Sequence, residues 1–375
     1  TYQPPALTVK GAKRHPTDLV QSAAMAAVDS PKLTYRPNLP KAVVEGGVLS
    51  DVQIESVAYA GQAHQRMLQD GTTRRGFFVG DGTGVGKGRQ IAAIIQDNFR
   101  QGRRKAVWLS QSQKLYQDAG RDWGALGGDL AQLTNQSKTG AGEAIKHGDG
   151  VVFATYKTLS MGSMFGPKGE MVGTKGGKSR LMQLAGWLGD PEKFDGVIVF
   201  DEAHLMGNAM AMKGDRGTSS ASQQAMAGIE LQRRFPKARI VYASATGATE
   251  VENLAYADRL GLWGDGTSFA TKAEFVNKIA AGGVAAMEFV ARDLKAQGSY
   301  LARSLSMKGV QYERLEHTLT DDQRLIYDKL AEAWRNALQH FDVALAKTEA
   351  GKNGHAKSAA KSAFWSTNQR FWNQV

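Results

Sequence analysis

The sequence predicts an α/β fold: a mostly parallel, doubly wound sheet with helices on both faces, followed by a helical C-terminal extension. Five short apolar runs recur along the 375 residues, at 76–79, 106–109, 151–154, 197–200 and 240–243. Because each run is apolar on both faces, it is typical of a parallel strand that is covered on both sides. Helix-length stretches separate the runs, and strand–helix alternation of this kind indicates a doubly wound sheet.

Each apolar run ends in small or polar residues. These are Gly80-Asp81-Gly82, Ser110-Gln111, Thr155-Tyr156, Asp201-Glu202 and Ser244-Ala245-Thr246. Ligands of open α/β sheets bind outside the carboxyl ends of the strands. We therefore expect the chemistry of this chain to converge on one edge of one sheet.

The pattern along the chain predicts four regions. Residues 1–48 are expected to form an arm, 49–266 the lobe that contains the sheet, 267–312 a helical extension and 313–375 a helical connector. Within them, helices are expected at 50–67, at 271–305 and from the capping box at Thr320 to about 338. We expect flexible loops at 160–178 and 207–222, and a loose helix or a linker at 344–363. The chain begins with Thr1-Tyr2 and not Met, so we expect a piece of a longer protein.

Composition limits the possible functions. The absence of cysteine excludes disulfides and cysteine-based zinc sites, and the seven histidines form no His-x-x-x-His pair. No apolar run is long enough to span a bilayer, and a cytoplasmic location is expected. The net charge of +11 favours a polyanionic partner such as nucleic acid, although a solvated basic surface would give the same number.

A glycine-rich segment between the first apolar run and an apolar helix is typical of a phosphate loop. It reads Gly80-Asp81-Gly82-Thr83-Gly84-Val85-Gly86-Lys87-Gly88-Arg89. Glycines allow backbone N–H groups to point at phosphate, and the following helix N-terminus adds its dipole. We expect residues 81–89 to bind ATP, with Lys87 reaching its β- and γ-phosphates. A structural turn rich in glycine is the alternative.

Two positions depart from the general phosphate-loop pattern. Asp81 stands where the pattern has glycine, and Gly88 replaces the Ser or Thr whose hydroxyl normally binds Mg²⁺. The metal must then rely on the phosphates, on water and on Asp201, or on a nearby hydroxyl such as that of Thr83.

The fourth run leads into Asp201-Glu202-Ala203-His204. At a strand end, Asp201 is suited to hold Mg²⁺ through water, and Glu202 to polarise the attacking water. His204 is expected to couple this site to Ser244 and Thr246. A helix N-terminal charge pair is the alternative for the two carboxylates.

Other polar residues are candidates for binding. The carboxamide of Gln53 can pair with adenine, although an exposed helical glutamine explains it equally well. Contacts to phosphodiester oxygens are expected from the residues that follow the second and third runs, namely Ser110, Gln111, Lys114 and Thr155.

These stretches resemble the Strawberry notch family of superfamily 2 helicase-like ATPases, including phage and plasmid members. The resemblance extends from Leu49 to Phe371. It rests on residues 49–55, 80–89, 179–184, 194–204, 238–247, 259–264, 283–288, 300–306 and 364–371. The family's loop also has Gly after the Lys, so the resemblance implies that Gly88 is a family feature, and it supports the adenine role of Gln53.

The resemblance implies that residues 49–266 are the first, ATP-binding lobe of two RecA-like lobes, with ATP and Mg²⁺ as cofactors and DNA as the favoured partner. A phage-encoded member of the family is expected in the bacterial host cell or associated with the virion. No second set of strands is evident after Gln311, so the second lobe and its arginine fingers are expected elsewhere in the full protein. We therefore expect nucleotide binding with weak hydrolysis. A nucleotide-gated interaction or antirestriction module remains the alternative. A kinase or GTPase is disfavoured, because no guanine-reading Asn-Lys-x-Asp is present.

Overall fold

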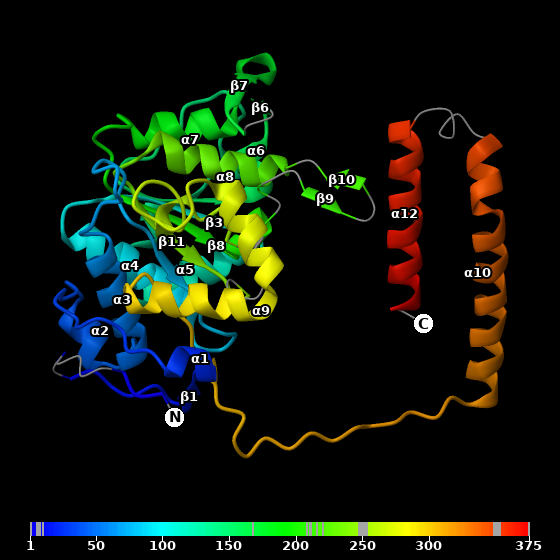
Figure 1. Ribbon diagram of the computed structural model, residues 1–375, viewed down its shortest axis with the longest axis horizontal. Coiled ribbons are helices and arrows are strands. Elements are labelled where there is room, and N and C mark those ends of the chain that lie inside the picture. The colour runs from blue at the N-terminus through cyan, green and yellow to red at the C-terminus, as the bar shows by residue number, and fades with distance from the viewer. Residues whose placement is uncertain are drawn as a thin grey trace. The chain divides into compact units, whose positions relative to one another are not determined.

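The five predicted strands all lie in one parallel sheet (Figure 1). The computed structural model describes residues 2–4, 9, 11–166, 169–207, 209, 212–214, 217–219, 221–246, 254–347 and 354–373. Within them, seven strands pair in the order β12-β2-β11-β8-β3-β5-β4. Their bounds are β2 Phe77–Val79, β3 Lys105–Ser110, β4 Leu133–Asn135, β5 Gly150–Thr155, β8 Val197–Asp201, β11 Arg239–Ala243 and β12 Tyr300–Leu301.

Helices cover both faces of this sheet, because alternate strand residues face opposite ways. Phe77, Val79 and Val199 pack with α3 (Asp51–Ala63), α4 (Lys87–Arg100) and α5 (Leu115–Ala125). Phe78 and Phe200 belong to the core on the other face, with α7 (Arg180–Leu188), α8 (Gln223–Arg234) and α9 (Lys272–Ala296). The predicted doubly wound arrangement is confirmed.

Three predictions about the segments between strands were wrong. Residues 160–178 were expected to form a flexible loop, but they contain the hairpin of β6 (Ser163–Phe165) and β7 (Met171–Thr174). In the expected loop at 207–222, β9 (Met212–Gly214) pairs with β10 (Gly217–Ser219). The helix expected to reach 305 ends at Ala296, because the following residues form β12 and then β13 (Ser304–Leu305).

The N-terminal segment packs on the sheet's helices and on β13. It contains β1 (Leu19–Val20), α1 (Ala23–Ala26) and α2 (Lys41–Glu45). Strand β1 pairs antiparallel with β13, so residues far apart in sequence meet beside the phosphate loop. Short helical turns complete the unit: α6 (Tyr156–Ser160), η1 (Leu130–Gln132), η2 (Gln136–Lys138), η3 (Lys175–Gly177), η4 (Ala203–Met206) and η6 (Asp258–Leu260).

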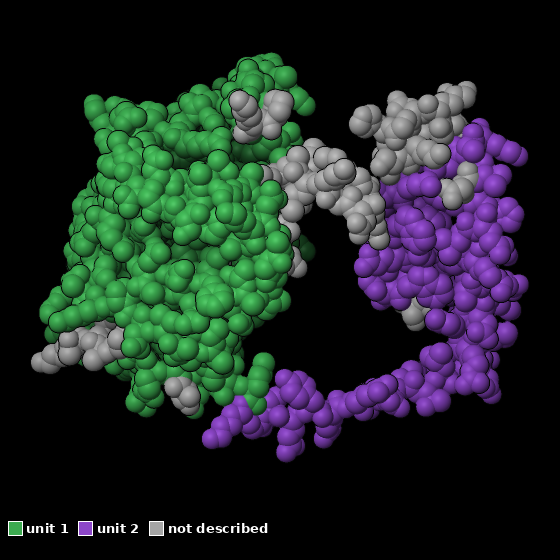
Figure 2. Space-filling model, viewed as in Figure 1, with its two compact units in different colours: residues 1–307 green, residues 308–375 purple. Residues whose placement is uncertain are grey.

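The chain divides into two compact units, residues 1–307 and 308–375 (Figure 2). The second contains α10 (Asp321–Lys347) and α12 (Gly354–Trp372), so α10 continues past the predicted end at 338. Their aromatic rings contact one another, with Phe341 and Phe364 stacked at 4.0 Å between ring centroids. The finer predicted boundaries at 48, 266 and 312 remain predictions. No helix in the described part of the chain is long and apolar enough to cross a membrane.

Candidate nucleotide site

The phosphate loop joins β2 to α4 at the carboxyl edge of the sheet. Gly84 and Gly86 have φ of 91° and 89°, a region that glycine adopts without strain. A Cβ atom at position 86 would also lie 2.4 Å from Gln53 Nε2. Because the first turn of a helix leaves its N–H groups without intrahelical acceptors, the start of α4 at Lys87 presents donors suited to phosphate.

Lys87 rests on the loop itself. Its Nζ donates to the carbonyl oxygen of Asp81 at 3.0 Å. This is a weak anchor for an ammonium group, and a phosphate oxygen would be a stronger acceptor. The amine is therefore free to exchange its partner when a nucleotide binds.

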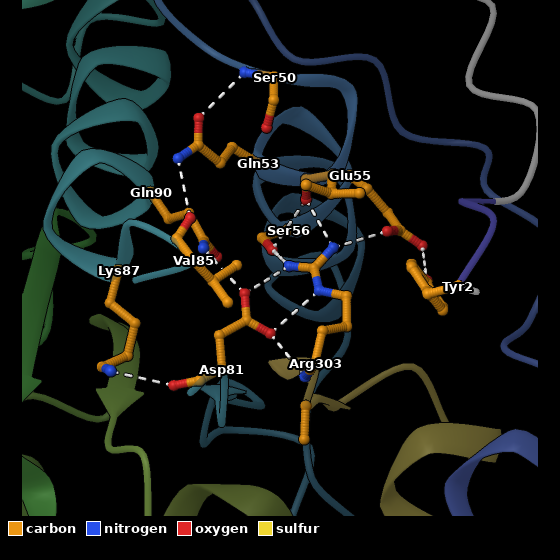
Figure 3. A network of polar contacts seen from close by, with 12 residues as sticks. Tyr2, Ser50, Gln53, Glu55, Ser56, Asp81, Val85, Lys87, Gln90 and Arg303 are labelled. Atoms are coloured by element: carbon orange, nitrogen blue, oxygen red, sulfur yellow. Dashed lines mark hydrogen bonds and ion pairs between the residues drawn. The ribbon is translucent and has the colours of Figure 1, made fainter. Parts of the chain in front are cut away.

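The Asp81 side chain does not face the loop interior but a buried ion network (Figure 3). Arg303 donates Nε to Asp81 Oδ1 at 3.0 Å and Nη2 to Oδ2 at 2.6 Å. It also donates Nη1 to Glu55 Oε2 at 2.8 Å, and the Tyr2 hydroxyl donates to Glu55 Oε1 at 2.6 Å. Gln90 Nε2 donates to Asp81 Oδ2 at 2.8 Å, so the carboxylate has three side-chain donors.

The charged side chains of this network are fully buried, and they hold the phosphate loop in place. The side chains of Arg303, Glu55 and Asp81 are 0% exposed. Burial acts to lower the pKa of Arg303, but the two carboxylates outweigh it and hold that pKa above its ordinary value. The backbone adds two bonds, from Gly80 N to Leu301 O at 2.6 Å and from Gly82 N to Arg303 O at 2.7 Å.

These bonds correct the expectation that Asp81 and Gly82 bind ATP. The Asp81 carboxylate and the Gly82 N–H are occupied within the protein, so neither is available to ATP. Both residues therefore shape the loop, and the remaining donors from Thr83 to Arg89 are the candidates for phosphate binding. The sequence did not identify Arg303 or Glu55. The one signal was Asp81 itself, since a carboxylate in place of the pattern's glycine needs a partner.

Gln53 lies on the first turn of α3 and touches the phosphate loop. Its Oε1 accepts from Ser50 N at 3.0 Å, and its Nε2 donates to Val85 O at 3.0 Å. The first bond belongs to a capping box, which fixes the side chain. The carboxamide is thus held beside the loop, and its role toward adenine remains a prediction.

The acidic pair lies on the same edge as the phosphate loop. Strand register aligns Val79, the last residue of β2, with Ala243 of β11 and then with Asp201 of β8. With neighbouring strands about 4.8 Å apart, two strand spacings place Asp201 roughly 10 Å from Val79. The phosphate loop and the acidic pair therefore lie close together on this edge of the sheet.

Asp201 and Glu202 are held in place by their neighbours. Ser110 Oγ donates to Asp201 Oδ2 at 2.9 Å, and the Glu202 N–H donates to Oδ1 at 3.0 Å. Burial raises the pKa of Asp201 to about 6, and a bound cation would favour the ionised form again. Glu202 has φ of 51°, the one positive value among the described non-glycine residues, and such strain is frequent at functional sites.

His204 connects the acidic pair to β11. Its Nδ1 lies 3.3 Å from Glu202 Oε2 and 3.1 Å from Ser244 Oγ. Ser244 Oγ in turn lies 3.3 Å from Thr246 Oγ1. The structure therefore brings together all the residues predicted to couple the two segments.

The predicted phosphodiester contacts separate into two groups. Gln111 and Lys114 are exposed near the start of α5. Ser110 is fully buried and bonds Asp201, while Thr155 is 5% exposed and its Oγ1 accepts from Thr158 N at 3.1 Å as the cap of α6. These two hydroxyls are engaged inside the protein, so the expectation that they contact nucleic acid is corrected.

The family model described as P-loop containing NTP hydrolase pore-1 matches residues 14–329. The chain belongs to this family. The phosphate loop is therefore that of a P-loop NTPase, which binds nucleotide, normally with Mg²⁺. The prediction of an α/β P-loop ATPase fold is confirmed to this extent.

Strawberry notch proteins and one plant protein are similar over nearly the whole chain. Protein strawberry notch of Drosophila melanogaster is 40% identical over 97% of this chain and 21% of its own length. Protein strawberry notch homolog 1 of Gallus gallus is 40% identical over 99% of the chain and 29% of its own length. Protein FORGETTER 1 of Arabidopsis thaliana is 38% identical, with 28% of its length covered. The chain thus spans less than a third of these relatives.

Solved structures of helicase-like ATPases are more distant. The Sulfolobus solfataricus SWI2/SNF2 ATPase core in complex with dsDNA shares 16% identity, with a TM-score of 0.43 over 77% of this chain and 53% of that chain. The UvsW helicase from bacteriophage T4 shares 10% identity, with a TM-score of 0.32 over 74% of this chain and 64% of that chain.

Proposed function

We propose that this chain is the first RecA-like lobe of an ATP-driven superfamily 2 DNA translocase or helicase, within a larger phage or plasmid protein. The observation that carries the proposal is the continuous path from the acidic pair through His204 to Ser244. It joins the residues suited to ATP hydrolysis to the strand end beside the phosphate loop. A motor needs such a path, because hydrolysis must change the grip on its track.

Each residue at this edge has a role that its geometry supports. Lys87 exchanges the Asp81 carbonyl for phosphate oxygens. Asp201, oriented by Ser110, would hold a hydrated Mg²⁺, and Glu202 would accept a proton from the attacking water. When bound, Mg²⁺ neutralises charge on the phosphates.

The other half of the machinery belongs to the proposed second lobe. After residue 311, the described residues form helices and no strand. A transition-state arginine contributes about 10³–10⁵ in rate, and the proposal places it in that lobe. We therefore expect the isolated chain to bind ATP and to hydrolyse it slowly.

The proposed nucleic-acid track passes the exposed side chains of Gln111 and Lys114. The net charge of +11 supports a polyanionic partner. We expect both side chains to contact phosphodiester oxygens, and such contacts carry no sequence information.

ATP turnover by the full-length protein tests the proposal. We expect stimulation by DNA, and loss of turnover with retained ATP binding in Glu202→Gln. No stimulation by single- or double-stranded DNA would overturn the motor assignment. If Glu202→Gln loses ATP turnover but the full-length protein keeps its function in the cell, a nucleotide-gated interaction module is supported instead.

A further inference from the structure

Gly88, which lacks the usual hydroxyl, lies beside the carboxylate of Asp122 on α5. A Cβ atom at position 88 would lie 2.3 Å from Asp122 Oδ2 and 3.4 Å from its Cγ. Gly88 is not among the glycines with positive φ, so its backbone conformation does not require glycine. The space taken by the Asp122 carboxylate therefore explains why residue 88 has no side chain.

The two oxygens of Asp122 have different surroundings. Oδ1 accepts from Arg89 Nε at 3.1 Å, and Arg89 Nη1 also donates to Val48 O at 3.1 Å. Within the described part of the chain, Oδ2 receives no hydrogen bond. The side chain of Asp122 is 14% exposed. Arg89 thus fixes the carboxylate and leaves one oxygen directed at the start of α4.

Position 88 is where a phosphate loop places its metal-binding hydroxyl. Mg²⁺ prefers oxygen ligands, keeps several waters, and is typically bound by one or two carboxylates together with substrate phosphates. Asp201 supplies one carboxylate from β8. The Asp122 oxygen beside Gly88 is a second carboxylate oxygen suited to Mg²⁺. It belongs to α5, whereas Gly88 belongs to α4.

We propose that Asp122 takes the place of the missing hydroxyl at position 88 and holds the hydrated Mg²⁺ that accompanies ATP. The inference rests on the proposed ATP site. It assigns Gly88 and Asp122 as a matched pair in which the glycine makes room and the carboxylate supplies the oxygen. Arg89 is a positioning residue that orients Asp122.

Nucleotide affinity measured with and without Mg²⁺ separates this role from a purely structural one. The binding of a non-hydrolysable ATP analogue is measured in Mg²⁺ and in EDTA, and the ratio of the two Kd values is the readout. Asp122→Asn keeps the size of the side chain and an acceptor for Arg89. We expect Asp122→Asn to reduce the Mg²⁺-dependent increase in nucleotide affinity by about 10- to 100-fold, while its Kd in EDTA stays unchanged.

Two further variants test the pairing independently of Asp122→Asn. Gly88→Ala should displace the carboxylate and reduce the same ratio. Gly88→Ser combined with Asp122→Ala restores the usual hydroxyl. This double variant should recover much of the wild-type ratio of Kd values. The matched control is Asp118→Asn, one turn earlier on α5, whose carboxylate is 48% exposed and pairs with Arg121. It should leave the ratio unchanged.

The outcomes are distinct. A wild-type ratio in both Asp122→Asn and Gly88→Ala overturns the inference, and so does an equal loss in Mg²⁺ and in EDTA, which indicates a structural ion pair. Nucleotide binding by the wild type that does not depend on Mg²⁺ also overturns it. Absence of nucleotide binding by the wild type, or an unchanged Kd in Lys87→Ala, instead contradicts the proposed function.

Discussion

Arg303 and Asp81 form a fully buried, two-bond ion pair between β12–β13 and the phosphate loop, with N–O distances of 3.0 and 2.6 Å. The pair ties the loop to a segment more than 200 residues away in the sequence. Because Glu55 of α3 shares the same guanidinium, three elements meet at one side chain. The shape of the phosphate loop is therefore maintained by charge as well as by its glycines.

Removing the guanidinium should destabilise the first unit strongly. Arg303→Met leaves Asp81 and Glu55 buried without a counter-charge, and breaking a buried pair in this way costs about 3–5 kcal/mol. Urea unfolding measures the loss. A triple variant that adds Asp81→Asn and Glu55→Gln should recover part of it, because no buried charge remains.

A surface pair provides the control for this prediction. Arg121→Met breaks the contact with Asp118, where the two side chains are 68% and 48% exposed. The unfolding free energy should change by no more than about 0.5 kcal/mol. A similarly small effect for Arg303→Met would show that the buried network does not hold the loop.

Glu202 should show a conflict between stability and activity. Its φ of 51° is strained for a side chain with a Cβ atom. Glu202→Gly should therefore raise the unfolding free energy by about 1 kcal/mol while abolishing ATP hydrolysis. Glu202→Ala also loses the carboxylate but keeps the Cβ atom, so it should not be stabilised. Equal stability of the two variants would argue against backbone strain.

Gly86→Ala should disrupt the phosphate loop for two reasons. Its φ of 89° disfavours any side chain, and the new Cβ atom would lie 2.4 Å from Gln53 Nε2. We expect a loss of about 1–3 kcal/mol in stability and weaker ATP binding. Gly102→Ala is the matched control, since Gly102 has φ of 87° but no atom within 4 Å of a Cβ. It should lose stability without losing nucleotide affinity.

His64 should make stability depend on pH. Burial lowers the pKa of His64 to about 3, and its Nε2 lies 3.0 Å from Ile240 O. In the unfolded chain the pKa is about 6.5, so between these values the unfolded state binds a proton that the folded state does not. The contribution of His64 is therefore complete above pH 6.5 and is lost as the pH falls, by about 1.4 kcal/mol per unit.

Unfolding free energies at pH 7.5 and 5.5 test this sign. His64→Gln keeps a donor for Ile240 O but cannot titrate. From pH 7.5 to 5.5, the wild type should lose about 1.4 kcal/mol more than the variant. Parallel losses in the two proteins would mean that other groups control the acid sensitivity.

The sequence by itself determined five of the seven strands described in the sheet and the two motifs at its edge, but not β4 or β12. The five apolar runs predicted their strands because each is a local pattern of buried residues, and the phosphate loop and acidic pair follow strand ends directly. The tertiary structure alone decided which side chains those motifs contact. Arg303 reaches Asp81, Asp122 reaches Gly88, and Ser110 turns to Asp201 instead of outward. Such contacts join distant segments, and their energies depend on burial and direction, which local residue patterns do not encode.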